Sequence, residues 1–406
     1  MPQSTIEDVF VFDAVRTPRG KGKTGGGLAA VKPVELIKQL VEALAKRNGA
    51  AVRTIDHLTV GCVGQVGDQG GHIALISKLY SGLPETASAW SVNNFCTSGL
   101  SAITGAVDKV ASGNASFVLA GGVESMSHVA FLADKAVYYN DPEFSAAMRY
   151  VPVAVSADVL ADRENVTRQE LDAVTVDSHQ RAGLAQTENL GQQSLIAVTG
   201  ADGNAVLTRD EYVRGNTTVE GIAGFTAAFE PLGSAYAKVL KSALGIEKLD
   251  HRHAVVHAPG TADGAGLAAL GTAAAGMTRG LKPRARVVAY AEAGGDPVLS
   301  LTAGAEAMDR VLKKAGMEIS DLDVIEYMEA FAVVPALFRR RFPAVQDKVN
   351  VFGGHIARGH ALGATGAILT SALIDAMEQK DAQLGMVVCF AASGIGSAMI
   401  LERVAA

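Results

Sequence analysis

Aromatic residues and cysteines are scarce in this 406-residue chain, whereas glycine is abundant. Aromatic side chains make up 5% of it, there are three cysteines, and glycine occurs 44 times. Three cysteines without CxxC spacing argue against a disulfide framework and a zinc knuckle, and favour free thiols in a reducing cytosol. No sustained basic run is present, and the net charge of -6 argues against a nucleic-acid surface. The expected partners are small molecules or other proteins.

Long apolar runs are missing as well. The longest, MVVCFAASGIGSAMIL at 386–401, contains two glycines and two serines, so we expect strand, turn and strand rather than a membrane span. The start, MPQSTIEDVF, has two acidic residues and lacks the basic and apolar regions of a secretory signal. Hydrophobic residues make up 49% of the chain, which suffices for a large core, so we expect a globular protein. Because its sparse cysteines suit a reducing compartment, we expect it in the cytoplasm.

Strand-like and helix-like segments alternate along the chain. A β-branched run at 9–15 precedes an amphipathic segment at 33–49 that ends in glycine, and 97–113 carries apolar residues at helical spacing. This alternation predicts an α/β fold with a largely parallel sheet covered on both faces. A similar order returns from residue 284, so the chain contains one βα design used twice.

A more charged stretch separates the two repeats and carries a helix-like segment at 166–189. We expect an N-terminal half made of 1–124 and 254–281, an inserted loop domain at 125–253 and a C-terminal half at 282–406. Periodicity leaves open whether the insertion is a lid, an oligomerisation arm or a substrate flap.

Two motifs suggest other functions but fit them poorly. RGKGKTGGG follows a strand, yet Thr17 stands where a phosphate-binding loop needs its first glycine, so a solvated basic turn is the better interpretation. His251, His253 and His257 lack further ligands at suitable spacing, and we expect structural or surface histidines rather than metal ligands. Cys62, between valines of a strand-like run, is expected in the core.

Cys96 is the strongest candidate for a nucleophile. It directly precedes the helix-like segment TSGLSAITGAVDKVASG, where unpaired backbone N–H groups and the helix dipole lower a thiol pKa. Such a cysteine needs a base, and His360 occupies the equivalent helix start of the second repeat. If the halves pack face to face, both helix starts share one pocket, and Cys389 would reach it as a proton-transfer group.

Five segments resemble the thiolases in this order: NNFCTSGLSAI, LAGGVESMS, YMEAFA, GGHIARGHALGATGA and VCFAASGIG. DAVRTPRGKG near the start and EYVRGNTTVEGIAGFTAAFE in the insertion look similar to the same family. The resemblance covers nearly the whole chain. It implies the thiolase fold, in which two βαβαβαββ halves form a five-layered α/β/α/β/α arrangement with an inserted loop domain, and it implies a homodimer or homotetramer.

The resemblance also implies an activity in fatty acid metabolism, namely CoA-dependent cleavage of a 3-oxoacyl-CoA to acetyl-CoA and a shortened acyl-CoA. Cys96 would accept the acyl group, His360 would take its proton, and Cys389 would act on the α-carbon as acid or base. His360 is implied in one oxyanion hole, and the N–H groups of Cys96 and Ala391 in the other. CoA is then a co-substrate, with no metal and no covalently bound cofactor.

Several positions depart from the family pattern. Met328 stands where thiolases usually have asparagine, beside Glu329 and Phe331, and these three are candidates for the substrate pocket. On the coenzyme side, the CoA-binding candidates are Arg214, Thr226, Pro259 and Gly260, of which Thr226 and Pro259 replace a basic residue and a serine.

Two other functions stay open at this stage. The same chemistry in reverse would condense two acetyl-CoA molecules into acetoacetyl-CoA. A chain that has lost thiolysis would instead serve as an acyl or lipid carrier or as a subunit of a complex.

Overall fold

The computed structural model describes residues 7–404. Its strands are β1 Phe10–Arg16, β2 Gly20–Lys21, β3 His57–Gly61, β4 Ser88–Val92, β5 Phe117–Ser125, β6 Val198–Thr199, β7 Ala205–Leu207, β8 Ala262–Gly271, β9 Ala285–Gly294, β10 Val324–Tyr327, β11 Leu384–Ala391 and β12 Ile395–Arg403. Ten of them form one sheet, ordered β10-β11-β12-β9-β1-β8-β5-β3-β4 with β2 beside β8. β1 and β9 share only two residue pairs, so the sheet divides there into two halves.

The two halves have the same strand order. β4, β3, β5, β8 and β1 lie side by side in the first half, and β10, β11, β12 and β9 follow the same order in the second. A single bridge between Ile325 and Val349 occupies the place of the outer strand in the second half. The prediction of one design used twice is therefore confirmed.

The sheet is not largely parallel, and that prediction is wrong. Within residues 7–404 its pairings comprise six antiparallel and three parallel ones. The last strand of each half returns against its neighbour, β12 against β11 and β8 against β5. An apolar run does not reveal the direction of its strand, which is why the sequence did not show these reversals.

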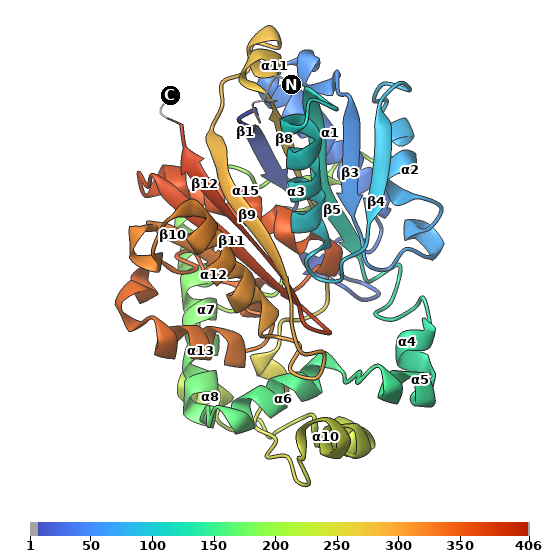
Figure 1. The fold of residues 1–406 in the computed structure, drawn as a ribbon. Helices are drawn as coiled ribbons and strands as arrows, with labels where there is room; N and C mark the ends of the chain where they lie inside the picture. The colour runs from blue at the N-terminus through green and yellow to red at the C-terminus, as the bar shows by residue number, and fades with distance from the viewer. Residues whose placement is uncertain (1–6, 405–406) are drawn as a thin grey trace, which may run out of the picture.

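Helices form three layers around and between the sheet halves (Figure 1). Those of the two halves are α1 Pro33–Asn48, α2 Ile73–Tyr80, α3 Ser98–Ala111, α11 Ala273–Thr278, α12 Ala303–Ala315, α13 Val333–Arg341, α14 His355–Arg358 and α15 Thr365–Gln379. α15 packs against β8 of the first half, against β11 of the second and against α3, so α3 and α15 lie between the halves, whereas α12 packs on β9 and β12 of the second half. Leu40 of α1 packs in a core cluster on the outer face of the first half. The predicted five layers are present.

Helices are the main regular elements of the insertion. They are α4 Val137–Asn140, α5 Pro142–Ala147, α6 Val153–Arg163, α7 Arg168–Glu188, α8 Val219–Ile222, α9 Glu230–Ala235 and α10 Ala237–Leu244. In Figure 1 α6, α8 and α10 lie below the sheet, and α7 runs up beside the second half. A capping box starts α7, in which Thr167 and Glu170 bond to each other's backbone N–H groups. Within residues 7–404 no helix is long and apolar enough to cross a membrane.

The backbones of α3 and α15 approach each other closely near their N-terminal ends. A Cβ atom on Gly366 would lie 2.2 Å from the backbone nitrogen of Leu100, and one on Gly99 would lie 2.7 Å from the carbonyl oxygen of Gly363. No side chain fits at these two positions. Glycine therefore allows one helix start from each half to meet.

We predict that Gly366→Ala lowers the free energy of unfolding by about 1–3 kcal/mol, because the added methyl group overpacks this contact. Gly105→Ala is the matched control, since Gly105 also lies in a central helix but a Cβ atom there would have nothing within 4 Å. The control should raise stability by about 0.5–1 kcal/mol. Urea denaturation measures both changes, and equal stability of Gly366→Ala and the unaltered chain would contradict the prediction.

Candidate active site

A tight turn between β4 and α3 presents Cys96. Thr97 Oγ1 donates to the carbonyl of Asn94 at 2.7 Å, and Ser98 Oγ donates to the carbonyl of Phe95 at 2.5 Å. Phe95 has a φ of 46°, a left-handed conformation that costs free energy in residues other than glycine. This braced turn holds Cys96 just outside the helix, where the residue is mostly but not fully buried.

His360 follows α14 and is fixed through both its backbone and its ring. Its backbone N–H donates to the carbonyl of Gly260 at 2.8 Å, and its Nδ1 lies 2.8 Å from Thr365 Oγ1. Its Nε2 is buried without a partner in the described part of the chain. Because Nδ1 is engaged by the hydroxyl, Nε2 is the ring nitrogen left to act on a ligand.

Cys96 and His360 line one cavity of about 470 Å³, to which both halves and the insertion contribute. Most of its walls are apolar. The residues predicted from the sequence that line it are Cys96, His360, Ala391, Met328, Phe331 and Pro259. Residues far apart in the sequence thus meet around a volume typical of small-molecule sites.

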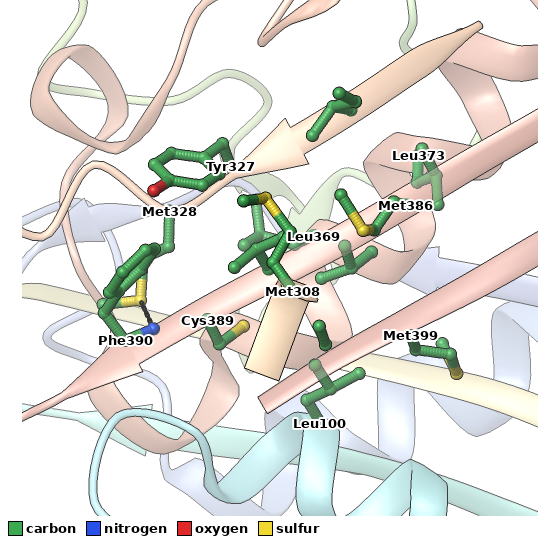
Figure 2. Packing of buried hydrophobic residues seen from close by; sticks show 14 of the residues in the cluster. Leu100, Met308, Tyr327, Met328, Leu369, Leu373, Met386, Cys389, Phe390 and Met399 are labelled. Atoms are coloured by element: carbon green, nitrogen blue, oxygen red, sulfur yellow. Dashed lines mark hydrogen bonds between the residues drawn. The ribbon is translucent and has the colours of Figure 1, made fainter. Parts of the chain in front are cut away.

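Cys389 lies near the end of β11 and is fully buried. Phe390 and Ala391 line the cavity, and Cys389 is not itself among the lining residues. Burial and, after it, the charge of Cys96 raise the pKa of the Cys389 thiol, so the two sulfurs are neighbours at the cavity wall. Figure 2 shows Cys389 among core side chains, beside the bond in which Met328 Sδ accepts the N–H of Phe390 at 3.4 Å. Met328 thereby braces the strand end that carries Cys389.

Comparisons with known proteins agree with this geometry. Residues 9–239 match the family model "Thiolase, N-terminal domain", and residues 281–403 match "Thiolase, C-terminal domain". This chain belongs to the thiolase family. A 3-ketoacyl-CoA thiolase of Psychrobacter cryohalolentis is 34% identical over 405 residues, which cover 98% of each chain. One of Serratia proteamaculans is 33% identical and covers 98% of this chain and 100% of the relative.

A solved structure shows the same fold. The crystal structure of the Bacillus anthracis acetyl-CoA acetyltransferase matches 99% of this chain and 100% of its own, with a TM-score of 0.85 and 27% sequence identity. Together with the matched family models, this makes the chain an acyltransferase of the thiolase family.

Burial dominates the electrostatics of this thiolase site. It raises the pKa of the Cys96 thiol to about 12, although the backbone N–H of Ala392 acts in the opposite direction. Burial, together with the charge of Arg19, lowers the pKa of His360 to about 3. The prediction that the helix start favours a thiolate is therefore wrong for the resting site, where thiol and imidazole are both neutral at pH 7.

Glu329 is not part of the cavity, which corrects its assignment to the substrate pocket. Its carboxylate accepts hydrogen bonds from Ser178 Oγ at 2.6 Å, from the N–H of Ile356 at 3.1 Å and from Asn350 Nδ2 at 3.1 Å. Successive side chains of an extended segment point to opposite sides, so Met328 faces the cavity and Glu329 faces away. Glu329 holds the insertion against the second half.

The four CoA-binding candidates are placed differently in this thiolase. Pro259 lines the cavity. Gly260 binds the backbone of His360, and a Cβ atom there would lie 2.5 Å from the ring of Tyr212. Arg214 and Thr226 are exposed and lie outside the cavity lining. The structure therefore brings two of the four, Pro259 and Gly260, to the catalytic residues.

Glu124 is a site residue that the sequence did not reveal. Its buried carboxylate accepts the N–H groups of Val63 and Gly363 at 2.9 Å each and that of Gly64 at 3.0 Å. Gly363 lies just beyond His360, so this carboxylate connects the two halves beside the cavity. The motif GGVES was one of the segments that resemble the thiolases, but it did not indicate that Glu124 binds the N–H of Gly363 in the other half.

The clustered histidines are structural. His251 and His253 both bond to Asp158, at 2.6 and 2.7 Å, and His257 bonds to Asp172 at 2.7 Å. Residues 7–404 contain no group of three or more His, Cys, Asp or Glu side chains arranged to hold a metal ion.

We predict that alkylation of Cys96 by iodoacetamide accelerates with pH, because only the thiolate reacts and the thiol pKa is raised by burial. Below that pKa the rate should rise about tenfold per pH unit. Mass spectrometry of the Cys96 peptide between pH 7 and pH 10 measures the rate. A plateau near neutral pH would show that the helix start outweighs burial after all.

Proposed function

We propose that this chain is a CoA-dependent thiolase that cleaves a 3-oxoacyl-CoA into acetyl-CoA and a shortened acyl-CoA through an acyl group on Cys96. The observation that carries the proposal is that His360, whose Nε2 has no hydrogen-bond partner among the described residues, lines the same apolar cavity as Cys96. The relatives named 3-ketoacyl-CoA thiolase support it.

In the first step, His360 Nε2 takes the proton of Cys96 while the sulfur attacks the C3 carbonyl carbon. Both groups are neutral at rest, so proton transfer accompanies formation of the carbon–sulfur bond. The N–H groups of Cys96 and Ala391 hold the negative oxygen that results. When the carbonyl re-forms, the C2–C3 bond breaks, and its electron pair leaves on the enolate of acetyl-CoA beside protonated His360.

In the second step, Cys389 donates a proton to C2 and completes acetyl-CoA. Burial raises the pKa of Cys389, so its thiolate is a strong base and takes the proton of a free CoA thiol. The CoA sulfur attacks the acyl group on Cys96 and releases the shortened acyl-CoA. The Cys96 thiolate regains its proton from His360, and every proton is accounted for.

The cavity favours cleavage over the condensation of two acetyl-CoA molecules. A largely apolar volume of about 470 Å³ suits an acyl group much larger than acetyl. The complete set of Cys96, His360 and Cys389 favours catalysis over a carrier function. We place the reaction in fatty acid metabolism, with CoA as a co-substrate that is not covalently bound. Three free thiols support a cytoplasmic location.

We predict that the purified protein consumes a 3-oxoacyl-CoA repeatedly only when free CoA is added. Without CoA, a single acyl group should form on Cys96, detectable by intact-protein mass spectrometry. Cys96→Ala should lose the adduct and reduce turnover roughly thousandfold or more. Repeated turnover without CoA, or substrate binding with no adduct, would exclude the proposed mechanism.

We also propose the division into an N-terminal half at 1–124 and 254–281, an insertion at 125–253 and a C-terminal half at 282–406. Support comes from β8, which follows the insertion and pairs with β1 and β5 of the first half. The insertion thus interrupts one half of the fold.

A homodimer through the β4 edge is the assembly that we propose. β4 ends the large sheet and pairs only with β3 in the described sheet order. Exposed apolar side chains gather on β4 and the neighbouring α2, namely Trp90, Leu75, Ile76, Leu79 and Tyr80. An unpaired edge with such a patch invites pairing with a second copy.

We predict that Leu79→Glu converts the dimer to a monomer in light scattering after gel filtration, because it places a charge within this patch. Met277→Glu is the matched control, since Met277 is even more exposed, 75% against 55%, but lies on α11 outside the patch. The control should stay dimeric. A monomeric unaltered chain at micromolar concentration would exclude the interface.

A further inference from the structure

The catalytic cavity is unusually rich in aromatic side chains for this chain. The whole sequence has 13 Phe, 8 Tyr and 1 Trp, and seven of these side chains line the cavity. Four of the seven come from the insertion, namely Phe131, Tyr139, Tyr150 and Tyr236. A chain that uses few aromatic residues elsewhere thus concentrates them around its nucleophile.

Four tyrosines of the insertion form a continuous array, which we call the tyrosine wall: Tyr138, Tyr139, Tyr150 and Tyr236. Tyr150 is its centre, with ring centroids 5.0 Å from Tyr138, 6.0 Å from Tyr139 and 6.1 Å from Tyr236. The planes are inclined by 46–73°, as aromatic pairs prefer. Tyr138 stands behind the three that face the cavity.

The tyrosine wall is tied to the C-terminal half of the molecule. Tyr138 Oη donates to Ser393 Oγ at 2.7 Å, within the turn that follows Cys389. Arg149, next to Tyr150, donates to Asp296 Oδ2 at 2.5 Å. These two contacts hold the wall in place relative to the acyl-transfer residues, so the cavity offers preformed aromatic surface rather than a mobile apolar loop.

We propose that the tyrosine wall selects 3-oxoacyl-CoA substrates whose acyl group ends in an alicyclic or aromatic ring. This inference rests on the proposed function and names its substrate class. An aromatic ring makes stacked or edge-on contacts with the inclined tyrosines that a linear chain does not make, and an alicyclic ring is rigid enough to pack against them as one unit. A ring also has fewer rotatable bonds, so less conformational entropy is lost when it is bound.

The test compares acyl groups with equal numbers of carbon atoms. The substrates are 3-oxo-5-phenylpentanoyl-CoA, 3-oxo-5-cyclohexylpentanoyl-CoA and the linear 3-oxoundecanoyl-CoA, each with saturating CoA. We expect kcat/KM for the phenyl substrate to exceed that of the linear one about tenfold, which corresponds to one or two aromatic contacts, and kcat/KM for the cyclohexyl substrate to exceed it by a smaller factor. Equal or better cleavage of the linear substrate overturns the inference and leaves the thiolase function intact. Cleavage of none of the three is a failure of the proposed function instead.

Variants of the wall identify the side chains responsible. Tyr150→Leu keeps an apolar residue but removes the central ring, and should bring the ratio of ring to linear substrate close to one. Tyr150→Phe retains the ring and should keep the ratio. Tyr236 is partly exposed, so Tyr236→Leu replaces the first variant if loss of Tyr150 prevents folding. A uniform rise in KM for all substrates and for free CoA would show that the tyrosine wall contacts the CoA part of the substrate rather than its acyl group, and would overturn the inference.

Discussion

The close contact between the backbones of α3 and α15 is the constraint on which the active site depends. Neither Gly99 nor Gly366 leaves room for a side chain, and a Cβ atom on Gly122 would lie 2.2 Å from the carbonyl oxygen of Gly363. Only through this approach do the two helix starts deliver Cys96 and His360 to one cavity. Glu124 secures the same junction by binding N–H groups on both sides. The relative position of Cys96 and His360 is therefore set by the packing of the two halves, not by the local sequence around either residue.

The same close packing sets the chemistry. A junction tight enough to align the residues also removes water from them, and in a poorly solvated site the neutral forms of thiol and imidazole are favoured. The helix start that favours a thiolate in water is outweighed here. The Nε2 of His360, held as the free nitrogen by Thr365, is then available to take the sulfur proton as the new bond forms.

Local patterns in the sequence predicted the internal repeat and the positions of Cys96 and His360, because these follow from periodicity and short motifs, whereas the five layers were implied by the resemblance to the thiolases. What they did not predict depends on contacts between distant segments. The antiparallel return of β8 and β12 follows from chain direction, which apolar runs do not encode. Glu329 shares a motif with Met328 but faces Ser178 of the insertion. The tyrosines of the tyrosine wall lie in or beside several short helices of the insertion, and no single segment of the sequence indicates that these residues contact one another.

The division of the catalytic pair between two halves of similar design determines when Cys96 becomes reactive during folding. On the proposed roles, the nucleophile comes from one repeat and its base from the other, and neither repeat contains both. A partly folded chain, with the halves apart, therefore holds a cysteine that no histidine can deprotonate. In such a chain Cys96 does not attack acyl-CoA thioesters, so acyl transfer begins only after the two halves have docked.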